Sequence, residues 1–226
     1  MESSAGMVVR AWEAGSTVTA WQRPAALLSA LTDIPLQQTL RLGIARRDAA
    51  LVAWRTALFG VQWPAFAQCP ACKTMLEYEL PQRSATVVES DEALEIDVSG
   101  LHLQVRWPNS LDLADAAACP DAREGRALLL KRILPEPVAE DFVGSVLTAM
   151  ADAHNGFTGI DLQCPECAAH WSEVFEAGEY LWREVRAAGR RILRDVDALA
   201  RAYGWSETEI LSLSDLRRNE YLAMVP

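Results

Sequence analysis

The sequence lacks several features that mark common classes of protein. No stretch approaches the roughly 20 apolar residues that cross a bilayer, and the first thirty residues lack a basic start followed by a long apolar run. The chain also has no internal repeat and no low-complexity tract. We therefore expect a cytoplasmic, soluble protein that neither spans nor binds a membrane.

Sequence motifs of catalysis are absent as well. There is no P-loop, no GxGxxG after a strand, no GxSxG elbow and no HExxH helix. Of the three histidines, none lies in the HxE triplet that a zinc deaminase needs. The acidic residues of the segment 89–95 are expected to form a solvated face rather than an acid/base pair. The sequence therefore predicts a protein that is not an enzyme.

Positive charge is scarce. The chain has 21 lysines and arginines against 31 aspartates and glutamates, for a net charge of −10, and residues 67–177 alone hold 7 basic and 19 acidic residues. Because such a surface repels phosphate backbones, no nucleic-acid partner is expected. Half of the 226 residues are hydrophobic, so the chain can bury the core of one globular domain, or of one domain with a sizeable insertion.

Hydrophobic periodicity predicts an α+β protein that is mainly helical. Residues 1–22 show only a weak pattern and are expected to form an irregular arm. Apolar residues at two-residue spacing predict strands over 75–80, 101–107 and 160–163. Apolar residues at three- to four-residue spacing and capping signals predict helices over 24–31, 36–59, 110–118, 122–134 and 136–152, then a long amphipathic helix from 179 to near Gly204 and two short helices.

The clearest chemical signal is a pair of CxxC turns. Cys69 and Cys72 form the first, Cys164 and Cys167 form the second, and 91 residues lie between the two turns. Zinc takes four ligands in a tetrahedron, and a CxxC turn presents two thiolates from one tight knuckle, so two turns close a structural site with no position left for water. Paired cysteines of this kind fit metal binding in a reducing compartment better than a disulfide framework. The sequence predicts a zinc site of four cysteine thiolates, and a cysteine-only site also accepts iron.

Strand-like residues flank both turns, at 76–80 after the first and at 160–163 before the second. Two hairpins that lie side by side around one metal are therefore expected, as in a zinc ribbon whose halves are split by an insertion. We expect three regions: a helical region at 1–66, a zinc-ribbon-like module with a long acidic α/β insertion at 67–177, and C-terminal helices at 178–226.

Some observations leave alternatives open. Lys73 and Ala168 stand where a zinc knuckle often has the glycine that permits a positive φ. The competing interpretation is two unrelated pairs of buried or redox cysteines, although a thioredoxin-like pair would open a helix and Cys72 is followed by a strand. His170, three residues after Cys167, could replace one ligand, but with four thiols available we expect it to pack beside the site.

Other residues with chemical potential are assigned mainly to packing. Cys119 has no histidine nearby, so we expect a small buried hydrophobe rather than a nucleophile. Trp205 and Tyr221 are candidates for a docking surface, with the core as the favoured alternative. Three further tryptophans fall on or beside faces expected to be buried and are assigned to the core: Trp54, Trp107 and Trp182.

The features occur along the chain in a recognisable order: a helical N-terminal region, two CPxC turns around an acidic insertion, a long helix, and a terminal stretch from Ala202 to Leu222. This order resembles the T4-type bacteriophage baseplate protein family, whose members are also encoded in bacterial clusters for phage-tail-like contractile injection systems. The most specific matching parts are the two turns, the helix that contains Trp182, and the block WSExEIL that begins at Trp205.

The resemblance implies a non-enzymatic role in baseplate or hub assembly of a contractile tail, as a permanent component or as a chaperone-like assembly factor. It implies baseplate, hub or spike proteins as partners, in the cytoplasm or in an assembled particle. Our hypothesis is that the C-terminal helices from Gly178 onward, or the acidic insertion, bind such a partner. Three other functions stay open: a zinc-ribbon adaptor or regulator of transcription, which would need a basic surface; a chaperone of a cargo toxin; and a metal-dependent hydrolase, which would need an open metal position.

Overall fold

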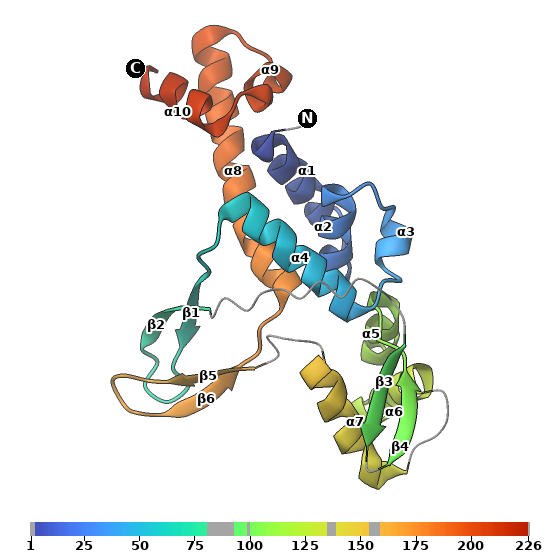
Figure 1. Cartoon of the computed structure of the whole chain (residues 1–226). Coiled ribbons are helices and arrows are strands. Elements are labelled where there is room, and N and C mark those ends of the chain that lie inside the picture. Colours follow the sequence, from blue (N-terminus) through green and yellow to red (C-terminus); the bar gives the residue numbers. More distant parts are fainter. Residues whose placement is uncertain (1–2, 81–92, 99, 135–138, 154–158, 226) are drawn as a thin grey trace. The chain divides into compact units, whose positions relative to one another are not determined.

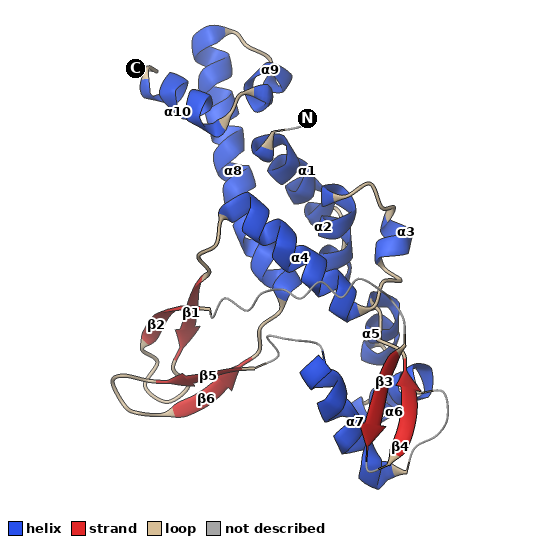
Figure 2. Ribbon diagram, viewed as in Figure 1, coloured by secondary structure: helices blue, strands red, loops and turns tan. Residues whose placement is uncertain are grey.

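A computed structural model describes the chain except residues 1–2, 81–92, 99, 135–138, 154–158 and 226 (Figure 1). The described residues form helices and three antiparallel two-stranded sheets (Figure 2), which confirms the α+β class. The chain divides into two compact units: unit 1 comprises residues 1–40 and 178–226, and unit 2 comprises residues 41–177. The three regions expected at 1–66, 67–177 and 178–226 follow sequence pattern and stay a prediction.

Unit 1 consists of helices. Its elements are α1 (Ser4–Ser16), the 3-10 turn η1 (Ala20–Gln22), α2 (Arg23–Leu31), α3 (Leu36–Thr39), α8 (Ala177–Tyr203), α9 (Glu207–Ser212) and α10 (Asp215–Ala223). The long amphipathic helix and the two short helices expected after residue 178 are therefore confirmed. Buried residues of α8 follow the helical period along one stripe, which includes Leu181, Trp182, Val185, Ala188, Ile192 and Leu199.

Helix α1 shows that the irregular arm expected over 1–22 was wrong. Its N-cap is Ser3, whose Oγ accepts a hydrogen bond from the Gly6 N–H at 3.1 Å. The buried positions of α1 are mostly small: Ala5, Val8, Val9, Ala11 and Gly15. A face of small residues gives little hydrophobic signal in a sequence, yet it lets a neighbouring helix approach closely.

The first helix of unit 2 is α4 (Ile44–Phe59). The single helix expected over 36–59 is therefore wrong: the chain forms two helices there, α3 and α4, with residues 40–43 between them. The interruption falls at Gly43, which forms an isolated β-bridge with Asn109, while the Ile44 N–H donates to the Pro108 carbonyl at 2.9 Å. The predicted end is confirmed: Gly60 has φ +90° and donates its N–H to the Thr56 carbonyl at 2.9 Å. A long-range backbone pairing therefore overrides the local helical pattern.

The middle of unit 2 packs one hairpin against helices. The strands are β3 (Leu94–Val98) and β4 (Leu101–Val105), and the helices are α5 (Ser110–Ala117), α6 (Ala122–Ile133) and α7 (Glu140–Ala153). Their shared core contains Ile96, Val98, Val105, Trp107, Ile133, Val146 and Met150, each at most 9% exposed. Strand β4 matches the expected strand at 101–107, and β3 was not expected. Of the acidic segment 89–95, residues 89–92 lie outside the described residues, and Glu95 lies on β3.

Candidate metal centre

Two further hairpins of unit 2 carry the CxxC turns. Strands β1 (Pro64–Gln68) and β2 (Met75–Glu79) pair so that Gln68 lies opposite Met75, and β5 (Ile160–Gln163) and β6 (His170–Glu173) pair so that Gln163 lies opposite His170. Each turn therefore spans the six residues between the last pair of its hairpin. We call residues 63–79 and 159–177 the metal module.

The two turns have the same backbone geometry. In the first, the Cys69 N–H donates to the Thr74 carbonyl at 2.9 Å and the Lys73 N–H to the Cys69 carbonyl at 3.0 Å. In the second, the Cys164 N–H donates to the Ala169 carbonyl and the Ala168 N–H to the Cys164 carbonyl, both at 2.9 Å. Two segments that lie far apart in the sequence thus fold into one repeated knuckle.

The residue after the second cysteine of each turn is left-handed. Lys73 has φ +65° and Ala168 has φ +58°, and no other non-glycine residue in the described part of the chain has a positive φ. Each costs about 1–2 kcal/mol relative to a right-handed backbone. Both turns therefore adopt this backbone without the expected glycines. The left-handed residues add backbone strain, which the rest of the site must offset.

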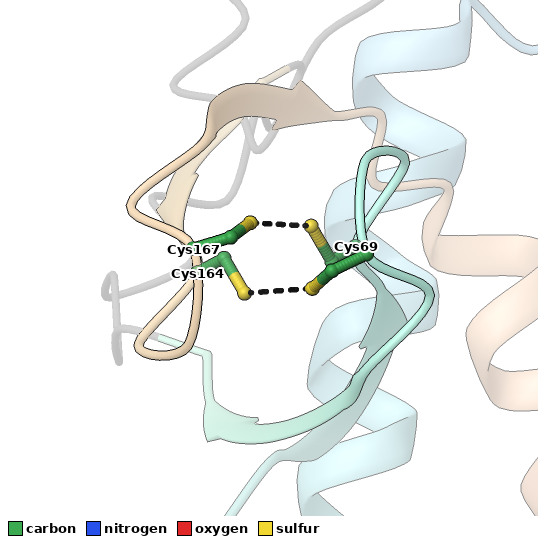
Figure 3. A group of neighbouring side chains, drawn as sticks. Cys69, Cys164 and Cys167 are labelled. Carbon is green, nitrogen blue, oxygen red and sulfur yellow. Dashed lines mark hydrogen bonds between the residues drawn. The ribbon is translucent and has the colours of Figure 1, made fainter.

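Folding brings the four sulfur atoms together (Figure 3). The Cys69 and Cys167 Sγ atoms lie 3.6 Å apart, the Cys72 and Cys164 Sγ atoms 3.5 Å apart, and all four lie within 4.8 Å of one another. Disulfide bonding requires about 2.05 Å, and a tetrahedron of Zn–S bonds near 2.3 Å places its sulfurs about 3.8 Å apart. The geometry therefore fits a tetrahedral site of four sulfur ligands.

The four cysteines differ in their exposure and in their pKa. Cys69 and Cys164 are buried, whereas Cys72 and Cys167 are exposed. Hydrogen bonds from Thr74, through its side chain and backbone, lower the pKa of Cys72 to about 6, and the Cys72 backbone N–H lowers the pKa of Cys69. The Ala169 N–H also lowers the pKa of Cys167, but the neighbouring thiols and burial outweigh it and raise that pKa to about 12.

The Thr74 hydroxyl is a part of the cluster's surroundings that the sequence did not predict. Its Oγ1 lies 3.3 Å from the Cys72 Sγ, and this hydrogen bond lowers the pKa of Cys72 and so favours the thiolate, the form of cysteine that binds metals. A threonine two residues after a CxxC turn gives no distinctive signal, because its role depends on the fold of the knuckle.

Aromatic contacts close the module at the end away from the cysteines. Trp63, just before β1, and Phe175, just after β6, have ring centroids 6.0 Å apart. The buried Arg55 of α4 lies over the Trp63 ring at 4.4 Å and donates to the carbonyls of Gly60 and Gln62 at 2.8 and 2.6 Å. The hairpins are therefore joined at both ends, by apolar packing at one and by sulfur at the other.

The structure places the remaining candidates outside this site. His170 is exposed at the start of β6, and the four-atom cluster does not include it. Cys119 follows α5 and is half-buried, so the expectation of a buried hydrophobe was wrong; its Sγ donates to the Asp115 carbonyl at 3.5 Å. Within the described residues, no other group of three or more cysteine, histidine or acidic side chains is positioned to hold an ion.

The aromatic residues divide between core and surface. Trp107 and Trp182 are each 7% exposed, which confirms the core assignment, and Trp54 is half-buried. Trp205 is half-buried too and packs on Tyr203, with ring centroids 4.7 Å apart, and on Tyr221, at 4.8 Å. These three rings form one packed aromatic cluster in unit 1, whose outer ring, Tyr203, is 38% exposed.

Unit 2 also has an apolar hollow of about 580 Å³ between α5, α6 and α7. Its lining includes Leu113, Ala117, Leu129 and Leu147. Almost no polar group reaches it, so it offers no acid, base or nucleophile. Among the helices that the structure describes, none is both long and apolar enough to cross a membrane. Comparison of the chain with models of protein families, with curated proteins and with solved structures finds no match.

Proposed function

We propose that the four cysteines bind one structural zinc ion, and that the metal module is a zinc ribbon split by the insertion between β2 and β5. The observation that carries this proposal is the convergence of four sulfurs, all within 4.8 Å, from two knuckles of identical backbone geometry. Matching left-handed residues in both turns support it, because a strained backbone persists only where surrounding interactions hold it in place. Zinc bonds to all four sulfurs would hold the two turns in this way.

The test is metal analysis of the purified chain under reducing conditions. We expect about one zinc per chain, lost on replacement of Cys164 by serine. Cys119→Ser is the matched control, because it removes a thiol from the same unit without touching the cluster, and it should leave the zinc content unchanged. Iron in place of zinc would give visible absorption. A chain free of metal would contradict the proposal.

A metal held by four thiolates is expected to act structurally. Thiolates that fill the tetrahedron leave no position for the water that a catalytic zinc activates. The apolar hollow of unit 2 supplies no reactive group. These two observations favour a non-enzymatic protein whose metal joins distant segments of the chain, over a metal-dependent hydrolase.

We further propose that the protein is a structural or assembly protein of the baseplate or hub of a contractile tail. Its support is the resemblance carried by the two turns, the Trp182 helix and the block that begins at Trp205. Trp182 and Trp205 are both packed: Trp182 lies over Gly15 and under Arg23, and Trp205 lies in the aromatic cluster. A rigid unit with such anchors suits the presentation of surfaces to other proteins.

Association with tail components tests this second proposal. Contractile particles and baseplate intermediates would be purified from cells that express the chain with its neighbouring genes, then cross-linked and analysed by mass spectrometry. Cross-links to a hub, spike or baseplate protein are expected. Cross-links to RNA polymerase alone would favour a transcription adaptor, and cross-links to a toxin alone would favour a cargo chaperone; either result would contradict the baseplate proposal.

A further inference from the structure

One face of the β1–β2 hairpin presents large apolar side chains to solvent. Phe66 and Met75 are 65% and 60% exposed, while Ala65 and Ala67, on the opposite face of β1, are buried. A half-buried strand normally turns its larger apolar residues inward. On β1 the small residues point inward, opposite Leu76 and Tyr78 of β2, and the large residue Phe66 points outward beside Met75.

Two carboxylates share this face. The register pairs Phe66 with Glu77, Gln68 with Met75 and Pro64 with Glu79. Since side chains alternate between the two faces of a strand, Glu77 and Glu79 project on the same side as Phe66 and Met75. We call this surface the Phe66/Met75 face; its residues are Pro64, Phe66, Gln68, Met75, Glu77 and Glu79.

The whole metal module is negatively charged. Its one lysine or arginine is Lys73, whose Nζ donates to the Pro70 carbonyl of its own turn at 2.9 Å. Six carboxylates oppose it: Glu77, Glu79, Asp161, Glu166, Glu173 and Glu176. If the proposed zinc is bound, four thiolates around one divalent ion add two further negative charges. No cation of the module neutralises the carboxylates of the Phe66/Met75 face.

We propose that the Phe66/Met75 face is the docking surface for a basic segment of a partner protein, in which lysine or arginine side chains alternate with apolar ones. The apolar side chains of the partner would cover Phe66 and Met75, and its cations would pair with Glu77 and Glu79. Exposed apolar anchors rimmed by charge of one sign match the anatomy of protein interfaces, where the anchors supply affinity and the charges supply orientation and rate of association.

The experiment uses the full-length chain as purified and three short fluorescent peptides. The probe alternates lysine with valine, isoleucine or phenylalanine; one control peptide has glutamate in place of lysine, and the other has serine in place of the apolar residues. By fluorescence anisotropy, we expect the probe to bind at least about tenfold more tightly than either control peptide, and to bind less tightly as salt is raised.

Paired variants locate the binding on the protein. Phe66→Ser with Met75→Ser, and separately Glu77→Gln with Glu79→Gln, should each weaken binding of the probe about tenfold, and the glutamine pair should also flatten the salt dependence. The matched controls are on unit 1: Leu216→Ser, at a leucine 72% exposed on α10, and Glu207→Gln, at an exposed glutamate on α9, should change nothing. Equal affinity for all variants would overturn the proposal.

Zinc content measured on the same samples separates this inference from the proposed metal site. A metal-free chain that still discriminates between the peptides retains the docking surface and contradicts the zinc site. A zinc-loaded chain that binds all three peptides with equal affinity retains the zinc site and contradicts the docking surface. If Phe66→Ser with Met75→Ser releases zinc, those changes have disturbed the hairpin. The affinity and salt dependence of Glu77→Gln with Glu79→Gln then test the docking surface.

Discussion

Lys73 and Ala168 hold the same position and the same left-handed backbone in two turns that lie far apart in the sequence, with φ values of +65° and +58°. Each residue follows the second cysteine of its turn and donates its N–H to the carbonyl of the first, Cys69 or Cys164. Because neither lysine nor alanine favours a left-handed backbone, the agreement indicates that the arrangement of the cysteines sets the geometry of both turns.

Ala168→Gly is expected to stabilise the metal module. Glycine removes about 1–2 kcal/mol of left-handed strain and gives back roughly half of this in backbone entropy of the unfolded chain. The net gain should raise the denaturation midpoint in urea of the metal-loaded protein. Ala168 is the better test of the two positions, because the Lys73 side chain also bonds to the Pro70 carbonyl.

Ala71→Gly serves as the control for this change. Ala71 lies between the cysteines of the first turn, is exposed, and has no positive φ. Glycine there brings only the entropy cost and should lower the midpoint slightly. A gain at Ala71 equal to that at Ala168 would show that backbone strain is not the cause.

Removal of the proposed zinc is expected to loosen the two hairpin turns and leave the helices of unit 1 unchanged. Without zinc, the sulfur atoms of the two turns still lie 3.5 and 3.6 Å apart, and thiols that approach so closely repel once they ionise. Hydrogen exchange with and without a chelator measures this directly. The amides of Cys69 and Cys164 should lose protection, because their partners are the carbonyls of Thr74 and Ala169 within the turns.

Helices α1 and α2 provide the internal control in that experiment. Their amides belong to unit 1, which contains none of the cysteines. Equal loss of protection in α1 and in the turns would indicate global unfolding, and unchanged protection in the turns would mean that the metal does not hold them.

The sequence predicted the parts of the fold that carry a strong local signal. The stripe of α8 and the alternation of β5 need no tertiary information, and the two cysteine pairs predicted the cluster of four sulfurs by their chemistry. Strand β1 was missed because its inward residues are Ala65 and Ala67 and its large residue, Phe66, points to solvent. The pattern is that of a strand with its apolar face inverted, which sequence periodicity cannot assign.

Helix α1 was missed for a related reason. Helices α1 and α8 each accommodate a ring of the other: a Cβ built on Gly15 of α1 would lie 2.5 Å from the Trp182 ring of α8, and one on Gly189 of α8 would lie 3.0 Å from the side chain of Trp12 of α1. Large residues on one helix match the absence of a side chain on the other. Such complementarity is visible only when the two helices are placed side by side.

Gly15→Ala should therefore destabilise unit 1. A methyl group cannot occupy space 2.5 Å from a buried indole, so Trp182 or the helix must shift, at a cost of about 1–3 kcal/mol. Gly144→Ala on α7 is the matched control, because nothing lies within 4 Å of its Cβ; there the better helix propensity of alanine should add about 0.5–1 kcal/mol. Urea unfolding followed by Trp fluorescence measures both, and a stabilising Gly15→Ala would contradict the packing argument.

Asp112 organises the start of α5 through a nearly buried carboxylate, 7% exposed. Its Oδ2 accepts from Arg106 Nη1 at 2.7 Å and from the Asn109 N–H at 2.9 Å, and its Oδ1 accepts from Arg132 at 3.2 Å. Burial by itself would raise the pKa of Asp112, but the hydrogen bonds from Arg106 and Asn109 outweigh it and hold the pKa below its ordinary value of 3.8.

Asp112→Asn should cost about 2 kcal/mol at neutral pH, because it leaves two partly exposed arginines without their shared partner. Asp115→Asn, at a carboxylate 56% exposed that forms a 2.8 Å ion pair with Arg132, should cost less than about 1 kcal/mol. Since the folded pKa of Asp112 is lowered, its stabilisation is complete above about pH 4, the ordinary range of an aspartate, and is lost as the pH falls through the folded pKa. The gap in unfolding free energy between the wild type and Asp112→Asn should therefore be constant from pH 7 to 5 and narrow in more acidic solution; a gap that widens there would mean that the protonated acid, and not the carboxylate, is the stabilising form.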